Sequence, residues 1–468
     1  MIAITTLLKI KYERKQLVKS FLPKYLTAVC IDSRKANEHC FFVALKGDNH
    51  DSHNFIPDVI AKGCTVLIVS IQWFNLNATK YQTTAFIAVK DTTLALGQIA
   101  QQHRATLPVK IIAIGGSNGK TSTKELLYSV LSTQYNTLKT EGNLNNHIGV
   151  PLTLLRLTKQ HEYAVLEVGC NHFDEITYLC NISDPNYGLI TNIGKEHLEF
   201  FKNKAGVAKA ELELFDYLRT KKNTICFVNY ADTHLKNYAD KKLSTKQKQL
   251  YACKTGFHGT LMGYTPHFNP MLALYQGNKL ISTPIVNAFG KPALYNATAV
   301  ACVAMHFNIN LVNLNYALAN FVSASSKRMD TATYGGITFV NDCYNSNPDS
   351  VILGLDSMRD YTTTGKKYLV IGDMLELGKT SATEHLAIGK YIAKLKLNNV
   401  YLFGAESTQT LKGCGVAVKN KKLYDNKINL AQDLLKLLQP NDIVYVKGSR
   451  GMLMEEVTNY CKTKLQAE

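Results

Sequence analysis

Arginine is scarce in this sequence, and dense runs of basic residues are absent. The formal net charge of +17 and the isoelectric point near 9.2 are typical of proteins that bind nucleic acid. However, Arg fills only eight of the 53 basic positions, and no basic stretch carries the interleaved aromatic residues of a strand-binding groove. We therefore attribute most of the excess charge to Lys on solvated faces, where it also attracts small polyanionic substrates. No nucleic-acid partner is expected.

Cysteine pairs and long apolar runs are absent too. The 11 cysteines are scattered from Cys30 to Cys461 without a CxxC pair, which argues against a disulfide framework and a structural zinc site. No run of about 18 apolar residues occurs, so we expect no membrane span. These absences favour a protein of the reducing cytoplasm, and we expect it to be a monomer.

The length of the chain predicts several domains. At roughly 150 residues per domain, 468 residues correspond to about three domains. Short apolar runs alternate with amphipathic stretches, which predicts an α/β protein with largely parallel sheets. We expect domains at 1–106, 107–322 and 323–468. Strands are predicted at 40–45, 65–69, 109–114, 163–168, 187–191, 224–229, 337–340, 368–371, 400–403 and 443–446, and helices at 94–103 and 122–131.

A glycine-rich turn between a predicted strand and a predicted helix is the strongest local signal. Small residues in such a turn let backbone N–H groups surround phosphate oxygens at the helix N-terminus. Lys120 would neutralise the charge of the β- and γ-phosphates, and the Thr121 hydroxyl would reach Mg²⁺. The predicted nucleotide-binding residues of this loop are Gly116, Ser117, Asn118, Gly119, Lys120, Thr121 and Ser122.

One position departs from the general phosphate-loop spacing. Ile114 stands where G-x-x-x-x-G-K-[ST] requires Gly, so the loop is a shortened variant. The alternative is a plain strand-to-helix turn with a solvated Lys120.

The shortened loop and the block at 141–151 (EGNLNNHIGVP) together resemble the Mur ligases, a family of enzymes of cell-wall synthesis. Further blocks lie at 32–34 (DSR), 42–47 (FVALKG), 191–199 (TNIGKEHLE), 341–348 (NDCYNSNP), 372–378 (GDMLELG) and 447–452 (KGSRGM). They resemble the group of this family that joins D-alanyl-D-alanine to a UDP-linked muramoyl tripeptide. The blocks follow the family order and span almost the whole chain.

The resemblance implies an architecture and an activity. It implies the three-domain Mur ligase architecture, with an N-terminal domain for the UDP-sugar, a central P-loop ATPase domain and a C-terminal Rossmann-like domain for the acceptor. The implied substrates are UDP-N-acetylmuramoyl-tripeptide and D-Ala-D-Ala, and the implied cofactors are ATP and Mg²⁺. ATP would convert the tripeptide carboxylate into an acyl phosphate, which the dipeptide amine then attacks.

The resemblance also implies roles for single residues. Lys120, His197 and Glu211 match catalytic positions, while Thr121, Glu167, His197 and Glu211 match the metal region. ATP contacts are implied for Asn296, Arg328 and Asp342, and substrate contacts for Ser33, Arg34, Asn145, Asn146, Asn345 and Asn347. Structural alternatives stay open: a loop cap for Glu167, a satisfied structural residue for His197, backbone-bonded turn residues for Asn145 and Asn146, a surface ion pair for Arg328, and a turn-forming Asp for Asp342.

Glu211 stands at the most informative departure from the family. Family members carry at this position, 14 residues after His197, a Lys that CO₂ carbamylates into a carboxylate-like Mg²⁺ ligand. We hypothesise that the Glu211 carboxylate, a hard oxygen ligand, substitutes directly. A carbamylated Lys209 and a weakened second metal site are the alternatives; Lys209 lies about 200° away around a helix.

A second departure concerns the nucleotide base. The family pattern G-x-H-N-x-x-N appears here as GKPALYN at 290–296, so that only Asn296 remains. We expect Asn296 to make the surviving base contact, with a helix cap as the alternative. Two other functions stay open: a Mur-type ligase with a single amino acid as acceptor, and a degenerate nucleotide-binding scaffold.

Overall fold

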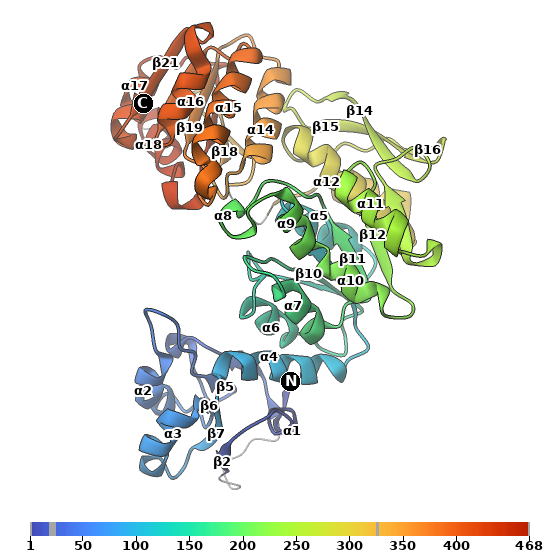
Figure 1. Cartoon of the computed structure of the whole chain (residues 1–468), viewed down its shortest axis with the longest axis vertical. Coiled ribbons are helices and arrows are strands. Elements are labelled where there is room, and N and C mark those ends of the chain that lie inside the picture. The colour runs from blue at the N-terminus through green and yellow to red at the C-terminus, as the bar shows by residue number, and fades with distance from the viewer. Residues whose placement is uncertain (1, 18–24, 324–326, 467–468) are drawn as a thin grey trace.

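The computed structural model describes residues 2–17, 25–323 and 327–466, and we describe it in the three predicted regions (Figure 1). Each predicted strand and helix is present, with ends that differ by one or two residues, and most neighbouring strands are parallel. The predicted α/β class is therefore confirmed. Within the described ranges, no helix is long and apolar enough to cross a lipid bilayer.

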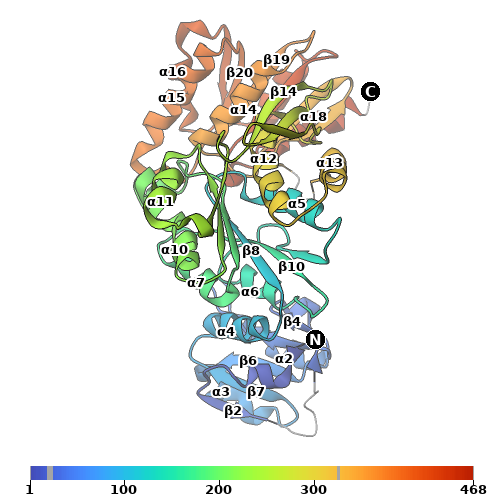
Figure 2. The same cartoon turned by 90° about the vertical axis from the view of Figure 1, so that its right-hand side faces the viewer.

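The described part of the N-terminal region forms one five-stranded sheet in the order β2-β7-β6-β5-β4 and a small ladder of β1 with β3. Its strands are β1 (Ile2–Ala3), β2 (Arg14–Gln16), β3 (Tyr25–Leu26), β4 (Ala28–Cys30), β5 (Cys40–Val43), β6 (Val66–Ser70) and β7 (Ala85–Val89). Its helices are α1 (Ile4–Leu7), α2 (Ile56–Ala61), α3 (Ile71–Asn77) and α4 (Thr92–Ala105). Helix α4 packs against α6 and α7 of the next region and so joins the two (Figure 2).

The central region is built on a long sheet in the order β16-β15-β14-β13-β12-β11-β8-β10-β9. The strands are β8 (Lys110–Gly115), β9 (Thr137–Lys139), β10 (Tyr163–Glu167), β11 (Tyr187–Ile190), β12 (Ile225–Asn229), β13 (Lys248–Tyr251), β14 (Phe257–Tyr264), β15 (Pro270–Gln276) and β16 (Lys279–Ser282). The helices are α5 (Lys120–Leu131), α6 (Gly149–Leu154), α7 (Glu175–Ser183), α8 (Leu198–Phe201), α9 (Lys204–Glu211), α10 (Glu213–Arg219), α11 (Thr233–Lys242), α12 (Gly290–His306) and α13 (Leu311–Ala319). The antiparallel extension β14-β15-β16 was not among the predicted strands.

Strand β8 shows why the centre of this sheet folds as it does. Its residues from Ile111 to Gly115 are all buried, and helices cover both faces. A continuous apolar run is typical of a parallel strand that is covered on both sides. Because β8, β10 and β11 are parallel, their carboxyl ends meet at one edge, where ligands bind in open α/β sheets.

The described C-terminal region forms a second, smaller α/β unit, with strand order β17-β18-β22-β19-β20-β21 and only β17 antiparallel to its neighbour. Its strands are β17 (Asp330–Tyr334), β18 (Ile337–Asp342), β19 (Lys367–Gly372), β20 (Asn399–Phe403), β21 (Asn420–Tyr424) and β22 (Ile443–Lys447). Its helices are α14 (Pro348–Asp360), α15 (Ser381–Lys394), α16 (Ser407–Cys414), α17 (Lys427–Leu435) and α18 (Glu455–Leu465).

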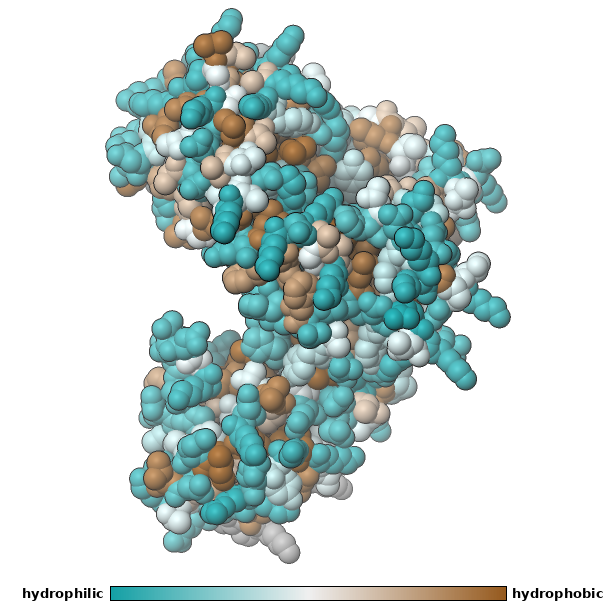
Figure 3. Space-filling model, viewed as in Figure 1, coloured by the Kyte–Doolittle hydropathy of each residue, from teal (hydrophilic) through white to brown (hydrophobic). Residues whose placement is uncertain are grey.

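The central and C-terminal regions lie against each other, whereas a wide notch separates the N-terminal region from the C-terminal region on one face (Figure 3). Helix α12 packs on α14, and the ammonium of Lys195 donates to Glu384 Oε1 at 2.6 Å across the junction. The carboxyl ends of the central strands therefore face the C-terminal region.

Candidate active site

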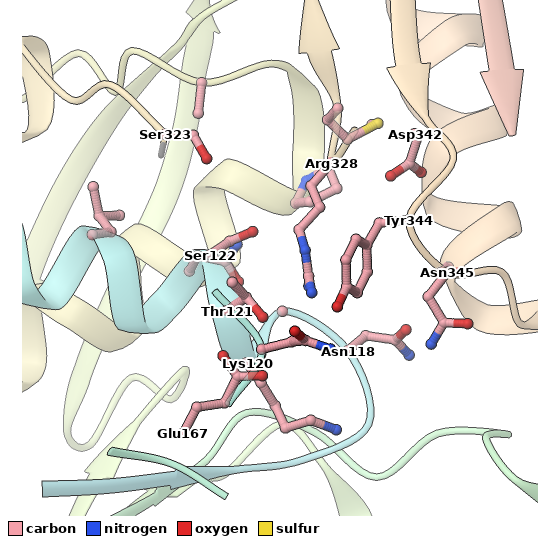
Figure 4. A pocket seen from close by; sticks show the side chains of 18 of the residues that line it. Asn118, Lys120, Thr121, Ser122, Glu167, Ser323, Arg328, Asp342, Tyr344 and Asn345 are labelled. Atoms are coloured by element: carbon pink, nitrogen blue, oxygen red, sulfur yellow. The ribbon is translucent and has the colours of Figure 1, made fainter. Parts of the chain in front are cut away.

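A pocket of about 600 Å³ lies at the junction of the central and C-terminal regions (Figure 4). The phosphate loop and the end of β10 form one side. The start of α12 contributes, and Arg328, Asp342 and Asn345 approach from the C-terminal region. Residues that are more than 200 positions apart in the sequence thus share one cavity.

Two glycines give the phosphate loop its path. Gly116 and Gly119 have φ values of 112° and 83°, in the range that favours Gly. A Cβ at Gly116 would lie 2.7 Å from the Thr191 backbone nitrogen, and one at Gly119 would lie 2.7 Å from Asn296 Oδ1. The backbone conformation favours Gly at both positions, and at Gly116 the nearby backbone nitrogen also leaves no room for a Cβ.

The backbone N–H groups of the loop fall into two sets. Those of Gly116, Ser117 and Asn118 donate to Glu211, to the Asn192 carbonyl and to the Asn192 side chain, respectively. For the N–H groups from Gly119 to Ser122, at the start of α5, no acceptor is found in the described part of the chain. The second set is the one that is open to a phosphate, and the helix dipole favours an anion there.

The Lys120 ammonium is already surrounded by carboxylates. Its Nζ lies 3.4 Å from Glu196 Oε2 and 3.9 Å from Glu211 Oε1. Burial alone would lower the pKa of Lys120, but Glu196 and Glu211 outweigh it and raise that pKa above its usual value. Lys120 is therefore a fixed cation at the base of the pocket, as the prediction requires.

Thr121 and Glu167 present buried oxygens that accept no hydrogen bond in the described part of the chain, although the Lys124 ammonium lies 3.5 Å from Glu167 Oε2. Thr121 Oγ1 and Glu167 Oε2 are buried without a hydrogen-bond partner, and both residues line the pocket. Glu167 Oε1 accepts from Asn145 Nδ2 at 3.0 Å. Hard oxygens of this kind suit Mg²⁺, which usually takes one or two protein ligands and completes its shell with phosphates and water. The pair fits a Mg²⁺ ion held between protein and nucleotide.

Lys124 is a functional candidate that sequence reasoning missed. Its side chain is completely buried, and its Nζ donates to the Gly142 carbonyl at 2.7 Å and lies 3.5 Å from Glu167 Oε2. Glu125 is a third partner, and Lys139 pairs with Glu125 in turn. Lys124 thus fixes both Glu167 and the loop that carries Asn145. Its position one helical turn after Lys120 was the only available signal.

His197 makes a contact between the regions. Its Nδ1 lies 2.5 Å from Glu376 Oε2 of the C-terminal region. Burial would lower the pKa of His197, but Glu376 and Glu196 raise it. His197 lines the same pocket as Thr121 and Glu167. In the described ranges, no three His, Cys, Asp or Glu residues are grouped so that they could hold a metal without further ligands.

Glu211 and Lys209 lie on opposite faces of α9. Glu211 is buried beneath the phosphate loop, where its Oε2 accepts from the Gly116 N–H at 2.6 Å. Burial raises the pKa of Glu211 to about 7, although Lys120 opposes this shift. Lys209 is exposed and its ammonium lies over the Phe173 ring. Of the two candidates, only Glu211 lies beside the predicted site.

Arg328 and Asp342, the predicted ATP contacts of the C-terminal region, are held in place by neighbouring side chains. The Arg328 guanidinium lies 3.9 Å from the centre of the Tyr344 ring, and its buried Nε has no hydrogen-bond partner among the residues that the structure describes. Asp342 Oδ2 accepts from Lys447 Nζ at 2.7 Å and from Tyr445. Lys447 also donates to the Asn345 carbonyl. Arg328 stacks on Tyr344, and no ion pair of its guanidinium is found among the described residues. Tyr344 and Lys447 are further pocket residues that sequence reasoning missed.

The asparagines fall into different environments. Asn296 lies inside α12, not at its end, and accepts from Thr123. Asn146 Oδ1 accepts from two backbone N–H groups of its own turn, as its structural alternative expects. Asn347 caps α14 and donates to Asn118 Oδ1 of the phosphate loop at 2.9 Å. Asn345 lines the pocket.

Ser33 and Arg34 lie in the N-terminal region and are not part of this pocket. They form the short 3-10 helix at Ser33–Lys35, which Asp32 caps. The Arg34 guanidinium makes two hydrogen bonds with the Asp32 carboxylate and lowers the pKa of Asp32 to about 2. The Arg34 side chain is 86% exposed and so is open to a ligand.

Comparison with known proteins assigns the family. Residues 114–304 match the Mur ligase middle domain, and residues 327–450 match the Mur ligase, glutamate ligase domain. The UDP-N-acetylmuramoyl-tripeptide:D-alanyl-D-alanine ligase of Escherichia coli is 33% identical over 92% of this chain and 93% of its own. The chain belongs to the Mur ligase family.

Other Mur ligases of the same group are similar to this chain over nearly its full length. The ligase of the same name from Bacillus subtilis is 30% identical and covers 94% of this chain and 96% of its own. The crystal structure of MurF from Acinetobacter baumannii is 30% identical, covers 94% of this chain and 95% of its own, and superposes with a TM-score of 0.84. The three-domain Mur ligase architecture is therefore confirmed, while the exact boundaries at 106/107 and 322/323 stay predictions.

Proposed function

We infer that this chain is an ATP-dependent ligase that joins D-Ala-D-Ala to UDP-N-acetylmuramoyl-tripeptide. The observation that carries this inference is the single pocket in which the phosphate loop and Glu167 of the central region face Arg328 and Asn345 of the C-terminal region. The relatives match almost the full length of this chain, and the substrates in their names support this choice of substrates.

The reaction joins two anions before it forms the amide bond. A carboxylate oxygen of the tripeptide attacks the γ-phosphorus of ATP, ADP leaves, and an acyl phosphate results. The dipeptide amine then attacks the acyl carbon, phosphate leaves, and the nitrogen loses a proton. Positioning and charge neutralisation provide most of the catalysis in phosphoryl transfer. Lys120 and the open N–H groups at the start of α5 would bind the phosphates.

Mg²⁺ would supply further positive charge at the phosphates when it is bound. Thr121 and Glu167 would hold it, and His197 and Glu211 are the proposed residues of a second metal region. The burial of Glu211 beside the loop, together with the outward position of Lys209, supports Glu211 as the direct substitute for a carbamylated lysine.

The contacts between the regions would protect the acyl phosphate from water. Asn347 donates to Asn118 of the loop, and the Lys195 backbone N–H donates to Asp349 Oδ2 at 2.7 Å. These contacts keep the C-terminal region over the phosphate loop. Exclusion of water from a closed site prevents hydrolysis of reactive intermediates.

The remaining predicted residues would bind the substrates. Ser33 and Arg34 would contact the UDP part in the N-terminal domain, Asn145 and Asn146 would border the acyl donor, and Asn345 and Asn347 the dipeptide. Asn296, Arg328 and Asp342 would contact ATP.

We place the reaction in the cytoplasm, because ATP is a substrate and all 11 cysteines are free thiols.

The test is a coupling assay with purified protein, ATP, Mg²⁺ and UDP-N-acetylmuramoyl-tripeptide. With D-Ala-D-Ala as acceptor, we expect an ATP-dependent pentapeptide product, and with single amino acids we expect no product. The products are detected by mass spectrometry. Coupling of a single amino acid alone would instead indicate another Mur-type ligase. ATP binding without any substrate-stimulated phosphate release would indicate a scaffold.

A further inference from the structure

Glu196 is a buried carboxylate of the pocket to which the mechanism above gives no role. It lies in the loop between β11 and α8, directly before His197, and its side chain is 6% exposed. It lines the pocket together with Thr121 and Glu167. In the described part of the chain, Lys120 is the only cationic side chain within ion-pair distance of Glu196.

Lys120 serves two carboxylates at once. Its Nζ lies 3.4 Å from Glu196 Oε2 and 3.9 Å from Glu211 Oε1, and Glu211 is 1% exposed. A phosphate-loop lysine contacts the β- and γ-phosphates when a nucleotide binds. Lys120 would then share its single charge with several phosphate oxygens, and Glu196 and Glu211 would lack their cation. Buried carboxylates without a cation are strongly disfavoured, so they either take up a proton or bind another cation in place of the ammonium.

A second observation identifies the kind of cation. Thr121 Oγ1 is buried and has no hydrogen-bond partner in the described ranges; Thr121 lines the same pocket, next to Lys120 in the sequence and beside it in Figure 4. A hydroxyl oxygen and carboxylate oxygens next to phosphates form the ligand set of a hard divalent cation.

We propose that Glu196 is a ligand of a divalent cation in the nucleotide complex and that, without nucleotide, the Lys120 ammonium takes the place of that cation. This inference rests on the proposed binding of ATP at the phosphate loop. It predicts a linkage between the two ligands, because nucleotide binding withdraws Lys120 from Glu196 and the divalent cation restores the charge balance.

The experiment measures the Kd of the non-hydrolysable ATP analogue AMP-PNP, with EDTA and with Mg²⁺, by isothermal titration calorimetry. Wild type, Glu196→Gln and the control Glu199→Gln are compared; Glu199 is exposed on α8, three residues away. Without Mg²⁺, we expect Glu196→Gln to bind AMP-PNP at least about tenfold more tightly than wild type, since no carboxylate competes with phosphate for Lys120. The factor by which Mg²⁺ tightens binding should fall at least about tenfold in Glu196→Gln and stay unchanged in Glu199→Gln.

An unchanged Mg²⁺ factor in Glu196→Gln would overturn the proposal. Thermal unfolding verifies that each variant is folded. If Glu196→Gln is not folded, Glu196→Ala replaces it, and the same loss of the Mg²⁺ factor is expected for Glu196→Ala. The outcomes separate this inference from the proposed function. A wild-type protein that makes no pentapeptide, but whose Mg²⁺ factor depends on Glu196, would refute the proposed function and support the metal ligand. A wild-type protein that makes pentapeptide, with a Mg²⁺ factor independent of Glu196, would support the proposed function and refute the metal ligand.

Discussion

Replacement of Glu211 by Gln should stabilise the nucleotide-free protein at pH 8 and much less at pH 5. Burial beneath the phosphate loop raises the pKa of Glu211 from 4.5 to about 7. A carboxyl group with a raised pKa favours the folded state fully below pH 4.5, and this contribution is lost as the pH rises through 7. Gln resembles the neutral acid and can still accept from the Gly116 N–H.

The magnitude follows from the size of the shift. One pKa unit corresponds to about 1.4 kcal/mol. By linkage, ionisation of Glu211 costs the folded state about 3 kcal/mol at pH 8 but only about 1 kcal/mol at pH 5. Glu211→Gln should therefore raise the free energy of unfolding by about 2 kcal/mol more at pH 8 than at pH 5.

The assay has to report on the unfolding of the central region. Tryptophan fluorescence does not do so, because the single tryptophan, Trp73, lies in the N-terminal region. Hydrogen exchange of peptides from residues 110–131, measured along a urea series in EDTA, gives the unfolding free energy around the loop. The control variant is the exposed Glu199→Gln, for which no pH-dependent difference is expected. The same change at both pH values, or a loss of stability of Glu211→Gln at pH 8 alone, would refute the reasoning.

Three other changes have defined expected outcomes. Lys120→Ala should lower pentapeptide synthesis at least about 100-fold, because the phosphates lose their buried cation. Lys124→Met should destabilise the central region by about 3 to 5 kcal/mol in urea unfolding, because Glu167 loses its buried partner, and should raise the KM for the tripeptide substrate. Synthesis by the unchanged protein should be the same in CO₂-depleted buffer with and without bicarbonate, because Glu211 already carries a carboxylate.

Each of these has a control or a contradicting result. Pentapeptide formation by Lys120→Ala at the wild-type rate would contradict the assigned site. Lys139→Met is the matched control for Lys124→Met, because Lys139 pairs with Glu125 and, in the described part of the chain, forms no ion pair with Glu167; equal effects of the two variants would show that the contact with Glu167 is unimportant. Strong rescue by bicarbonate would favour a carbamylated lysine over Glu211.

Features that depend on contiguous residues could be predicted from the sequence. The phosphate loop could be recognised because strand β8, the turn and helix α5 follow one another directly, and each has a local signal. The buried parallel strands appeared as apolar runs for the same reason. The contiguous blocks also indicated the Mur ligase family, which the comparisons confirmed.

The pairing of buried charges depends on the folded arrangement of the chain. Glu196 lies 76 residues after Lys120, and Lys447 lies 105 residues after Asp342, yet both pairs are in contact. No local pattern marks such pairs, because an isolated Glu or Lys is usually a solvated surface residue and becomes special only when folding removes it from water next to an opposite charge. Lys124 is the clearest case: its sequence position suggests an ordinary helix lysine, and the crossing of α5, β10 and the 141–146 loop makes it a buried link between Glu167 and the Gly142 carbonyl.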